Sequence, residues 1–528
     1  MQEKLPDFLR AQRWFGGKAQ PISAAEIVDV VPFAAASPPV FFLLVRVQYQ
    51  EGPAETYSVP LAQTTHAAAV PRPASGEAAP HLDISGGGEM VLYDATRNQP
   101  FLGALLQSIR ENRSFRGRQG ELRAASSPVL EELAPSGGAA LAPKLMAAEQ
   151  SNSSVIYGDR LVLKIFRRLE QGINPDLEIG RFLTENTGYR HVPLLAGYLE
   201  YAGDDGSHTS LAILQSFVRN QGDAWEFTLQ NVGRYFDRVL TASADKPPVL
   251  PTTSLLGLAE HSVPGQVREL VGPYLDSAQL LGTRTAELHL ALASAKGDPA
   301  FDPEPYSRAD QRTFCEAAVD LLRRNFRLLR RQQPCLQAGI QQQAQHVLDS
   351  EPELERRLHW LEECAITALR TRIHGDYHLG QVLVCGDDFV IIDFEGEPAR
   401  PLAERRHKQS PLQDVAGMLR SFQYAAYAPL LGVGPQSSRL PLPPETLGPW
   451  AYLWQMWVSA AFLHSYFATS RYAPFHPRDT REVLAILEAH LLEKAVYELG
   501  YELNNRPSWV RIPLSGIAQL TAGWSLRR

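Results

Sequence analysis

The chain reads Thr371-Arg372-Ile373-His374-Gly375-Asp376-Tyr377-His378-Leu379-Gly380-Gln381 and, twelve residues after Gln381, Asp393-Phe394-Glu395. An aspartate, an amide side chain five positions later and a second aspartate behind an apolar run are parts that phosphoryl transfer uses. In that chemistry one carboxylate orients the incoming hydroxyl, while an amide oxygen and a second carboxylate hold magnesium on the nucleotide phosphates. We therefore expect Asp376 to act on the hydroxyl, and Gln381 and Asp393 to bind magnesium.

Length and composition limit the classes of protein to consider. With 528 residues the chain exceeds what one simple core supports, which predicts two or three domains or lobes. Hydrophobic residues make up 44% and charged residues 21%, as is typical of a soluble globular protein. A net charge of -7 argues against a general nucleic-acid binder, because such a protein needs a basic surface.

Cysteine usage and apolar runs bear on the location. The four cysteines are widely spaced and form no CxxC pair, which favours a reducing compartment and argues against a zinc site. The first residues lack the apolar core of a secretory signal. The strongest apolar run, residues 40–45, is too short to cross a bilayer. These features predict a cytoplasmic protein without a membrane or nucleic-acid partner.

Residues 1 to 95 are expected to form a β-rich unit. Residues 27–31 and 41–49 have strand composition, and residues 56–61 are a candidate third strand. Residues 62–90 show no sustained period and are interpreted as a loop. Ahead of the strands, the run Trp14-Phe15-Gly16-Gly17-Lys18 is interpreted as a packed aromatic beside a tight turn.

A hairpin is expected near residue 158. The small polar residues Ser151-Asn152-Ser153-Ser154 lead into a strand, Gly158-Asp159 form a turn, and a second strand carries Lys164. In kinases such a hairpin covers the nucleotide phosphates, and a strand lysine reaches their oxygens. Alone this signal is weak, because a lysine in an amphipathic strand is usually a surface residue.

Two further segments fit the order of parts in a bilobal kinase. Asn174 and Pro175 open a helix as its N-cap and first residue, so that Glu178 lies in the first turn and can pair with Lys164. The alternative role of Glu178 is to complement the helix dipole. A strand follows at residues 211–218, and a strand that ends in a lobe connector is where an adenine binds backbone groups.

Beyond residue 219 the chain is predicted to be mainly helical. Residues 382–384 and 389–393 flank a turn and form a hairpin that returns Asp393 to the side of Gln381. Residues 242–266, with their several prolines, are interpreted as an irregular insertion. Tyr497 and Tyr501 are spaced i, i+4 and share a helix face, which suits a sugar but is more often part of a core.

The run from His374 to Gln381 resembles the HGDxHxxN catalytic loop of aminoglycoside-phosphotransferase-like kinases, with glutamine in place of asparagine. Its flanks resemble those of the maltokinase family more specifically. The resemblance extends over most of the chain and includes residues 12–18, 149–154, 372–398, 400–406 and 506–514.

The resemblance implies an α+β, bilobal protein-kinase-like fold. It would comprise an N-terminal β-rich cap domain (1–95), a β-rich intermediate lobe (96–218) and a helical C-terminal lobe (219–528). It also implies transfer of the γ-phosphate of ATP, with Mg²⁺, to the anomeric hydroxyl of maltose. The product, maltose 1-phosphate, would feed α-glucan (glycogen) synthesis, with a functional link to a trehalose synthase.

By matching motif, the resemblance assigns roles to named positions. Asp376 is the catalytic carboxylate, Gln381 and Asp393 are the magnesium ligands, and His374 and Asp414 keep the loop in shape. The ATP-binding residues would be Lys164, Glu178, Ser151, Asn152, Ser153, Ser154, Gln215, Phe217 and Val218. Tyr497 and Tyr501 match a pair of sugar-binding tyrosines. Gln519 departs from the pattern, because family members often carry a sugar-binding arginine there.

Two alternatives stay open from the sequence. One is a glucosamine kinase, or another small-sugar or aminoglycoside-type kinase of the same fold. The glucosamine kinases carry glutamine two residues before the HGD histidine, where this chain has Arg372. The other is an inactive sugar-binding pseudokinase, against which the joint presence of Lys164, Asp376, Gln381 and Asp393 argues.

Overall fold

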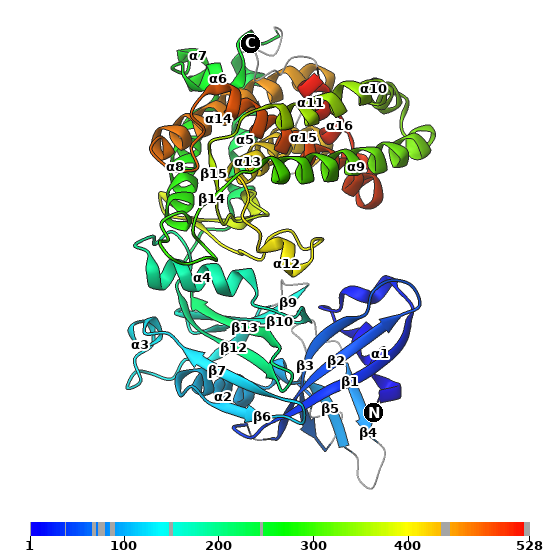
Figure 1. Cartoon of the computed structure of the whole chain (residues 1–528), viewed down its shortest axis with the longest axis vertical. Coiled ribbons are helices and arrows are strands. Elements are labelled where there is room, and N and C mark those ends of the chain that lie inside the picture. Colours follow the sequence, from blue (N-terminus) through cyan, green and yellow to red (C-terminus); the bar gives the residue numbers. More distant parts are fainter. Residues whose placement is uncertain are drawn as a thin grey trace. The chain divides into compact units, whose positions relative to one another are not determined.

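The structure is a computed structural model that describes residues 2–36, 38–65, 70–71, 80–84, 90–146, 151–242, 247–433 and 444–521 (Figure 1). The chain divides into two compact units. The first contains residues 1–186, 192–219 and 399–405, and the second contains residues 187–191, 220–398 and 406–528. The mixture of sheet and helix agrees with the predicted α+β class, whereas the boundaries at residues 95 and 218 stay a prediction.

The first unit begins with an antiparallel sheet in the strand order β1-β2-β3-β5-β4. Its strands are β1 (Ile22–Phe33), β2 (Val40–Tyr49), β3 (Glu55–Thr64), β4 (His81–Ile84) and β5 (Met90–Asp94), and helix α1 (Leu5–Ala11) precedes them. The three predicted strands are therefore confirmed. The loop predicted over residues 62–90 is wrong in part, because β4 lies inside it. Four residues are too few to show a period, and β4 is defined by its pairing with β5.

A second antiparallel sheet of the same unit has the order β6-β7-β12-β13-β10-β9-β8. Its strands are β6 (Ser114–Arg116), β7 (Gly120–Ser126), β8 (Pro143–Leu145), β9 (Asn152–Tyr157), β10 (Leu161–Phe166), β12 (Leu195–Gly203) and β13 (His208–Ser216). The helices of the unit are α2 (Gln99–Arg110), α3 (Val129–Leu133), α4 (Pro175–Asn186) and α12 (Leu402–Arg405). The predicted hairpin is confirmed as β9 and β10, and Gly158 takes the φ of +61° that its turn needs.

One hydrophobic core serves both sheets of this unit. Phe33 and Phe42 of the first sheet pack against Phe101 of α2, with ring centroids 5.4 and 5.7 Å from it. Buried residues of the second sheet, among them Leu122 and Leu163, belong to the same cluster. The short strand β11 (Arg168–Leu169) follows β10 and pairs with β3, so the chain passes from one sheet directly into the other.

The second unit is mainly helical, as predicted. Its helices are α5 (Ala224–Ala242), α6 (Leu255–Ala259), α7 (Gly265–Val271), α8 (Tyr274–Leu292), α9 (Arg308–Gln332), α10 (Ala338–Asp349), α11 (Glu351–Glu363), α13 (Leu412–Tyr427), α14 (Pro444–Ser470), α15 (Thr480–Asn505) and α16 (Arg511–Thr521). Two small antiparallel pairs accompany them: β14 (Glu304–Pro305) with β15 (Leu369–Arg370), and β16 (Val382–Cys385) with β17 (Asp388–Ile391). The segment 242–266 is not irregular throughout, because α6 forms within it, while residues 243–246 lie outside the described part.

Among the helices that the structure describes, none has the length and apolar character needed to span a membrane.

Helices α8 and α14 approach closely at Gly282. A Cβ atom added there would lie 2.2 Å from the carbonyl oxygen of Phe462, so only glycine allows this spacing. We expect Gly282→Ala to lower the free energy of unfolding by about 1–3 kcal/mol, as overpacking does. Urea unfolding followed by circular dichroism measures this change.

Gly103→Ala is the matched control, because nothing lies within 4 Å of a Cβ atom on this exposed glycine of α2. It should raise stability by about 0.5–1 kcal/mol, since alanine is the better helix former. Equal changes in the two variants would contradict the close packing at Gly282.

Candidate active site

The loop from Ile373 to Gln381 connects β15 to β16 and is held by its own histidine. Nε2 of His374 lies 2.9 Å from the carbonyl oxygen of Ile392, and Nδ1 accepts a hydrogen bond from the backbone N–H of Asp376 at 3.3 Å. A neutral ring that carries its proton on Nε2 satisfies both contacts. Gly375 turns the loop with a φ of +85°, a conformation that glycine adopts without strain. Both ring nitrogens of His374 therefore make contacts that hold the loop, which agrees with the structural role predicted for this residue.

Asp414, near the start of α13, binds the backbone of the same loop. Its two carboxylate oxygens accept hydrogen bonds from the backbone N–H groups of His374 (2.8 Å) and Gly375 (2.9 Å). Nε2 of the buried His289 lies 3.0 Å from Oδ2. Burial alone would raise the pKa of Asp414, but the contacts with His289 and the loop hold it below its usual value. The carboxylate therefore stays ionised and binds the loop through charge-assisted hydrogen bonds.

The hairpin β16–β17 brings Asp393 back beside Gln381. The Gln381 side-chain amide donates to Oδ2 of Asp393 at 3.0 Å, and the Ile392 N–H donates to the Gln381 carbonyl oxygen at 2.9 Å. Asp393 has a φ of +68°, which is uncommon for a residue other than glycine. The sequence predicted this return, and it follows from the hairpin.

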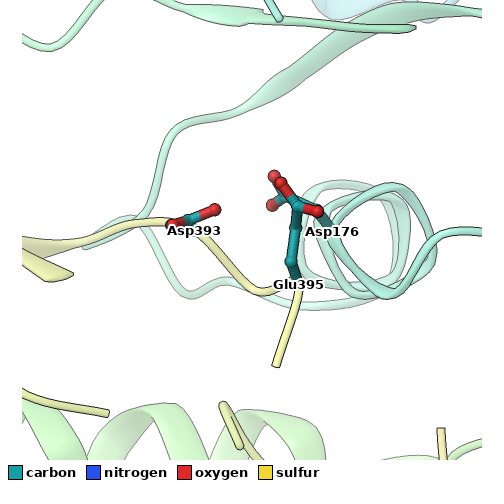
Figure 2. A group of neighbouring side chains, drawn as sticks. All are labelled: Asp176, Asp393 and Glu395. Carbon is teal, nitrogen blue, oxygen red and sulfur yellow. The ribbon is translucent and has the colours of Figure 1, made fainter. Parts of the chain in front are cut away.

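A second carboxylate, Glu395, lies close to Asp393. Figure 2 shows both on the segment after β17, and it also shows Asp176 in the first turn of α4. Carboxylate oxygens of Asp393 and Glu395 lie within 4.8 Å of one another. Oxygen donors are what Mg²⁺ prefers, so Gln381, Asp393 and Glu395 fit that ion chemically. Glu395 was not among the metal ligands predicted from the sequence.

Asp376 faces a lysine from the distant helix α15. Nζ of Lys494 lies 3.4 Å from Oδ1 of Asp376 and 3.5 Å from Oε2 of Glu397. The hydroxyl of Tyr497 donates to the other oxygen of Glu397 at 3.0 Å. Burial would lower the pKa of Lys494, but the neighbouring carboxylates, Asp376 first, raise it above its usual value. Lys494 is therefore a cation held between two carboxylates.

His378 lies near the other carboxylate oxygen of Asp376, with its Nε2 4.0 Å from Oδ2. Its Nδ1 accepts the N–H of Gly380 at 3.0 Å. Burial lowers the pKa of His378, so the ring is neutral at neutral pH and carries its proton on Nε2.

These residues line a cavity of about 580 Å³ that lies wholly within the second unit. The cavity is rich in aromatic and acidic side chains. Its lining comprises Asp223, Trp225, Asp376, His378, Gly380, Glu397, Pro398, Gly417, Ser421, Tyr424, Lys494, Tyr497, Glu498, Tyr501, Glu502, Arg506 and Trp509. The structure thus brings Asp376 together with both predicted sugar-binding tyrosines.

A second group of aromatic residues in the same cavity surrounds the end of α15. Arg506 lies over the rings of Tyr501 (5.3 Å) and Trp509 (4.7 Å) and pairs with Glu502 at 2.6 Å. The hydroxyl of Tyr424 also donates to Glu502 at 3.1 Å. Tyr501 is 46% exposed, which is unusual for a large aromatic core residue, so the interpretation as a core stripe does not apply to it.

Gln519 is not part of the cavity lining. Its side-chain oxygen accepts from Gln423 at 2.9 Å, and Gln423 in turn contacts the buried Arg420. Nε of Arg420 donates to Glu498 at 2.8 Å. Gln519 therefore lies in a network behind the cavity wall.

In the first unit, Lys164 lies on β10 directly opposite Ser154 of β9. Its Nζ is 3.1 Å from Oδ2 of Asp176, whose side chain is 1% exposed. Asn174 caps α4 as predicted, because its side-chain oxygen accepts the N–H of Asp176 at 2.8 Å. The predicted partner of Lys164 was Glu178, one turn into the helix, and that assignment stays a prediction. Asp176 was not among the residues predicted to contact Lys164.

Most of the predicted phosphate-covering residues lie in strand β9. Asn152, Ser153 and Ser154 belong to β9, and Ser151 precedes it, whereas residues 147–150 lie outside the described part. The hydroxyl of Ser153 is buried and accepts a hydrogen bond from Arg167 at 2.8 Å.

The predicted nucleotide hinge lies at the end of β13. Gln215 pairs with Val162 in the ladder, and the N–H of Phe217 donates to the carbonyl oxygen of Arg160 at 2.7 Å. Val218 follows directly after Phe217. The roles of these residues in nucleotide binding stay predictions.

Family comparisons agree with this arrangement. Residues 8–97 match the maltokinase N-terminal cap domain, and residues 258–432 match the phosphotransferase enzyme family. The chain carries a maltokinase cap domain and a phosphotransferase-family domain.

Curated relatives and solved structures extend these matches. A glucosamine kinase from Mycolicibacterium smegmatis is 25% identical over 71% of this chain and 78% of its own length. A glucosamine kinase from Streptacidiphilus jiangxiensis is 23% identical over 69% and 70%. Together with the two domain matches, these relatives support a sugar kinase.

The fold resembles that of solved glucosamine kinases. One, in complex with glucosamine, ADP and inorganic phosphate, superposes with a TM-score of 0.61 at 18% identity and covers 98% of this chain and 100% of its own. A glucosamine kinase structure described as crystal form B gives a TM-score of 0.63 at 19% identity, with 97% of each chain covered. The predicted kinase-like fold is thereby confirmed.

The phosphotransferase-family match covers the loop from His374 to Gln381, Asp393 and Asp414, but ends before α15. Lys494, Tyr497 and Tyr501 therefore lie beyond it. The role of Lys494 was not predicted from the sequence, because 118 positions separate this residue from Asp376. Its only local signal is its place three residues before Tyr497, on the same helix face.

Gly417 of α13 keeps the loop of this phosphotransferase-family domain in place. A Cβ atom there would lie 2.5 Å from the backbone carbonyl oxygen of Tyr377, the residue after Asp376. We expect Gly417→Ala to lower kcat for sugar-dependent ADP release by about 10- to 100-fold, because a small displacement of a reacting group is costly.

The control is Gly339→Ala on α10, where the added atom meets only Nη2 of Arg511 at 3.8 Å. Its kcat should stay within twofold of the unsubstituted chain. A Gly417→Ala protein that is folded by circular dichroism and fully active would contradict the close approach of α13 to the loop.

Proposed function

We propose that the protein transfers the γ-phosphate of ATP to the anomeric hydroxyl of maltose, giving maltose 1-phosphate and ADP. The observation that carries this proposal is the cavity that holds Asp376 together with Tyr497, Tyr501 and Trp509. Sugars stack their C–H faces on aromatic rings and bond their hydroxyls to carboxylates, and this cavity offers both. The cap domain supports the choice of maltose, because its match is to the maltokinase cap.

The size of the cavity also favours a disaccharide. Its volume of about 580 Å³ lies within the roughly 300–1,000 Å³ typical of sites for drug-sized ligands. Maltose is a ligand of that class in size. One glucose unit would place its hydroxyl at Asp376, and the other would extend toward Tyr501, Arg506 and Trp509.

In the proposed reaction Asp376 accepts a hydrogen bond from the anomeric hydroxyl and takes its proton as the oxygen bonds to the γ-phosphorus. The bond between that phosphorus and the β–γ bridging oxygen breaks, and ADP leaves with the electron pair. Nζ of Lys494 lies 3.4 Å from Oδ1 of Asp376 and thereby orients this carboxylate. Glu397 orients both Lys494 and Tyr497 at the same time.

Gln381, Asp393 and Glu395 would hold Mg²⁺, which neutralises charge on the nucleotide phosphates when bound. Lys164, with Glu178, would bind the phosphates of ATP, residues 151–154 would cover them, and Gln215, Phe217 and Val218 would form the hinge. Of these residues, Lys164 has the strongest structural support, since a buried carboxylate holds it at the strand surface opposite Ser154.

The wider assignments follow from the maltokinase resemblance. We propose a cytoplasmic location, a role for the product in α-glucan (glycogen) synthesis, and a functional link to a trehalose synthase.

A glucosamine kinase is the second candidate, and the named relatives favour it. Five carboxylates line the cavity, and a cationic amino sugar would find partners there. Against it stands Arg372, where glucosamine kinases carry glutamine. This arginine is buried, and its guanidinium lies over the ring of Phe301 at 5.2 Å. An inactive pseudokinase is disfavoured, because the chain retains Lys164, Asp376, Gln381 and Asp393.

We expect magnesium-dependent ADP release to be fastest with maltose among maltose, glucose, glucosamine and trehalose. A coupled assay of ADP at matched sugar concentrations measures this order. Fastest turnover with glucosamine would replace the maltose assignment by the second candidate, and no turnover with any sugar would favour the pseudokinase.

We expect Asp376→Ala to lose turnover by at least about 1,000-fold, because both the proton acceptor and the orienting group disappear. ADP should still bind with unchanged affinity by calorimetry. Asp387→Ala, in the exposed turn between β16 and β17, is the matched control and should retain full activity. Near-normal turnover of Asp376→Ala would overturn the role of this carboxylate.

A further inference from the structure

A buried cation lies behind one wall of the cavity. The side chain of Arg420, on α13, is 4% exposed, and among the described residues it does not belong to the cavity lining. Its Nε donates to Oε2 of Glu498 at 2.8 Å, and its Nη2 donates to the same oxygen. Glu498 does line the cavity, so a carboxylate of the cavity wall is bound from behind by a guanidinium.

Glu498 lies close to the reacting end of the cavity. It follows Lys494 by one turn of α15, so the two side chains share a helix face. Burial would lower the pKa of Lys494, but Asp376, Glu397 and Glu498 raise it above its usual value. Because Lys494 also contacts Asp376 at 3.4 Å, a sugar that presents its anomeric hydroxyl to Asp376 occupies the part of the cavity that Glu498 borders.

A chain of amide side chains holds Arg420 in this place. Its Nη1 donates to the side-chain oxygen of Gln423, which is 1% exposed. The amide of Gln423 donates to Gln519 of α16 at 2.9 Å, and the amide of Gln519 lies 3.5 Å from the hydroxyl of Tyr427. Gln519 therefore acts on the cavity wall through Gln423 and Arg420.

Helix α16 leaves space for the guanidinium at Gly516. A Cβ atom there would lie 2.0 Å from Nη1 of Arg420 and 2.9 Å from its Cζ. Glycine is unfavourable inside a helix, because it loses more conformational freedom on folding than any other residue. The space that Arg420 needs explains why a glycine occupies this position.

The position of this cation distinguishes Glu498 from a second carboxylate of the same wall. Glu502 pairs with Arg506 at 2.6 Å, and both of these residues line the cavity. The partner of Glu498 is instead buried outside the lining, where a bound sugar does not compete with it. A nearby guanidinium offsets the charge of a carboxylate toward other cations, while the carboxylate oxygens still accept hydrogen bonds from hydroxyl groups.

We propose that Arg420 is a positioning residue that makes the cavity selective for neutral sugars: it holds the carboxylate of Glu498 and offsets its charge, so that a cationic amino sugar gains no ion pair there. This inference rests on the proposed sugar-kinase function and deepens it, because it names the class of acceptor. Gln423, Gln519 and Gly516 contribute by keeping the guanidinium in place.

Glucose and glucosamine test the proposal, because they differ only in the hydroxyl or ammonium group at C2. Their affinities are measured as KM, or as inhibition constants against the sugar that the unsubstituted chain phosphorylates fastest. Arg420→Met keeps the length of the side chain and removes its charge. It should raise the affinity for glucosamine relative to glucose by about tenfold or more, because Glu498 then acts with its full charge.

Two further variants separate this effect from a loss of packing. Arg420→Met combined with Glu498→Gln removes both charges and should return the affinity ratio to within about threefold of the unsubstituted chain. Gly516→Ala should raise the ratio in the same direction as Arg420→Met, since the added atom displaces the end of the Arg420 side chain. Gly339→Ala on α10, where a Cβ atom meets nothing closer than 3.8 Å, is the matched control and should leave the ratio unchanged.

The affinity ratio distinguishes the possible outcomes. If Arg420→Met weakens both sugars equally, Arg420 contributes only stability and the proposal is wrong. If Arg420→Met does not fold, as judged by circular dichroism, an unchanged ratio in Gly516→Ala overturns the proposal in its place. Binding of glucosamine by the unsubstituted chain more than about tenfold tighter than glucose would also contradict it. No turnover of any sugar by the unsubstituted chain would overturn the proposed function itself, whereas an unchanged ratio in active variants refutes the role of Arg420 alone.

Discussion

The carboxylate of Asp414 is the constraint on which the catalytic arrangement depends. It accepts two backbone N–H groups from consecutive residues of the loop, and it contacts His289 from α8. These hydrogen bonds to a buried carboxylate fix the orientation of the backbone at His374 and Gly375. Helices α13 and α8 together therefore set the direction in which the side chain of Asp376 points. His374 then closes the loop against Ile392, ahead of Asp393.

The chain builds the rest of the cavity around this fixed loop from sequence-distant helices. Lys494 on α15 contacts Asp376 directly, and Tyr497 on the same helix donates to Glu397. Arg420 on α13 donates to Glu498 on α15. Both units of the chain contain a buried carboxylate that holds a loop or strand end, and in the second unit this carboxylate is Asp414. Arg167 with Asp94 plays that part in the first unit.

Local chemistry allowed several features to be predicted from the sequence. The turn between β16 and β17 returns Asp393 to Gln381, and Asn174 with Pro175 begins α4, because both depend on residues within a few positions. The partner of Lys164 could not be chosen in this way. Asp176 and Glu178 both lie in the first turn of α4, and which carboxylate faces β10 depends on how the helix is rotated against the sheet. Strand β4 was not predicted for a related reason, because it is defined by its pairing with β5.

The balance of charge in the cavity has a consequence for the end of a catalytic cycle. Asp223, Asp376, Glu397, Glu498 and Glu502 line it, against the two permanent cations Lys494 and Arg506. A neutral sugar enters such a site without electrostatic opposition. A phosphorylated sugar carries nearly two negative charges and, in the proposed reaction, would form among these carboxylates, which would repel it. The excess of carboxylates over cations would thus weaken binding of the phosphorylated sugar relative to the neutral sugar and favour release of the product.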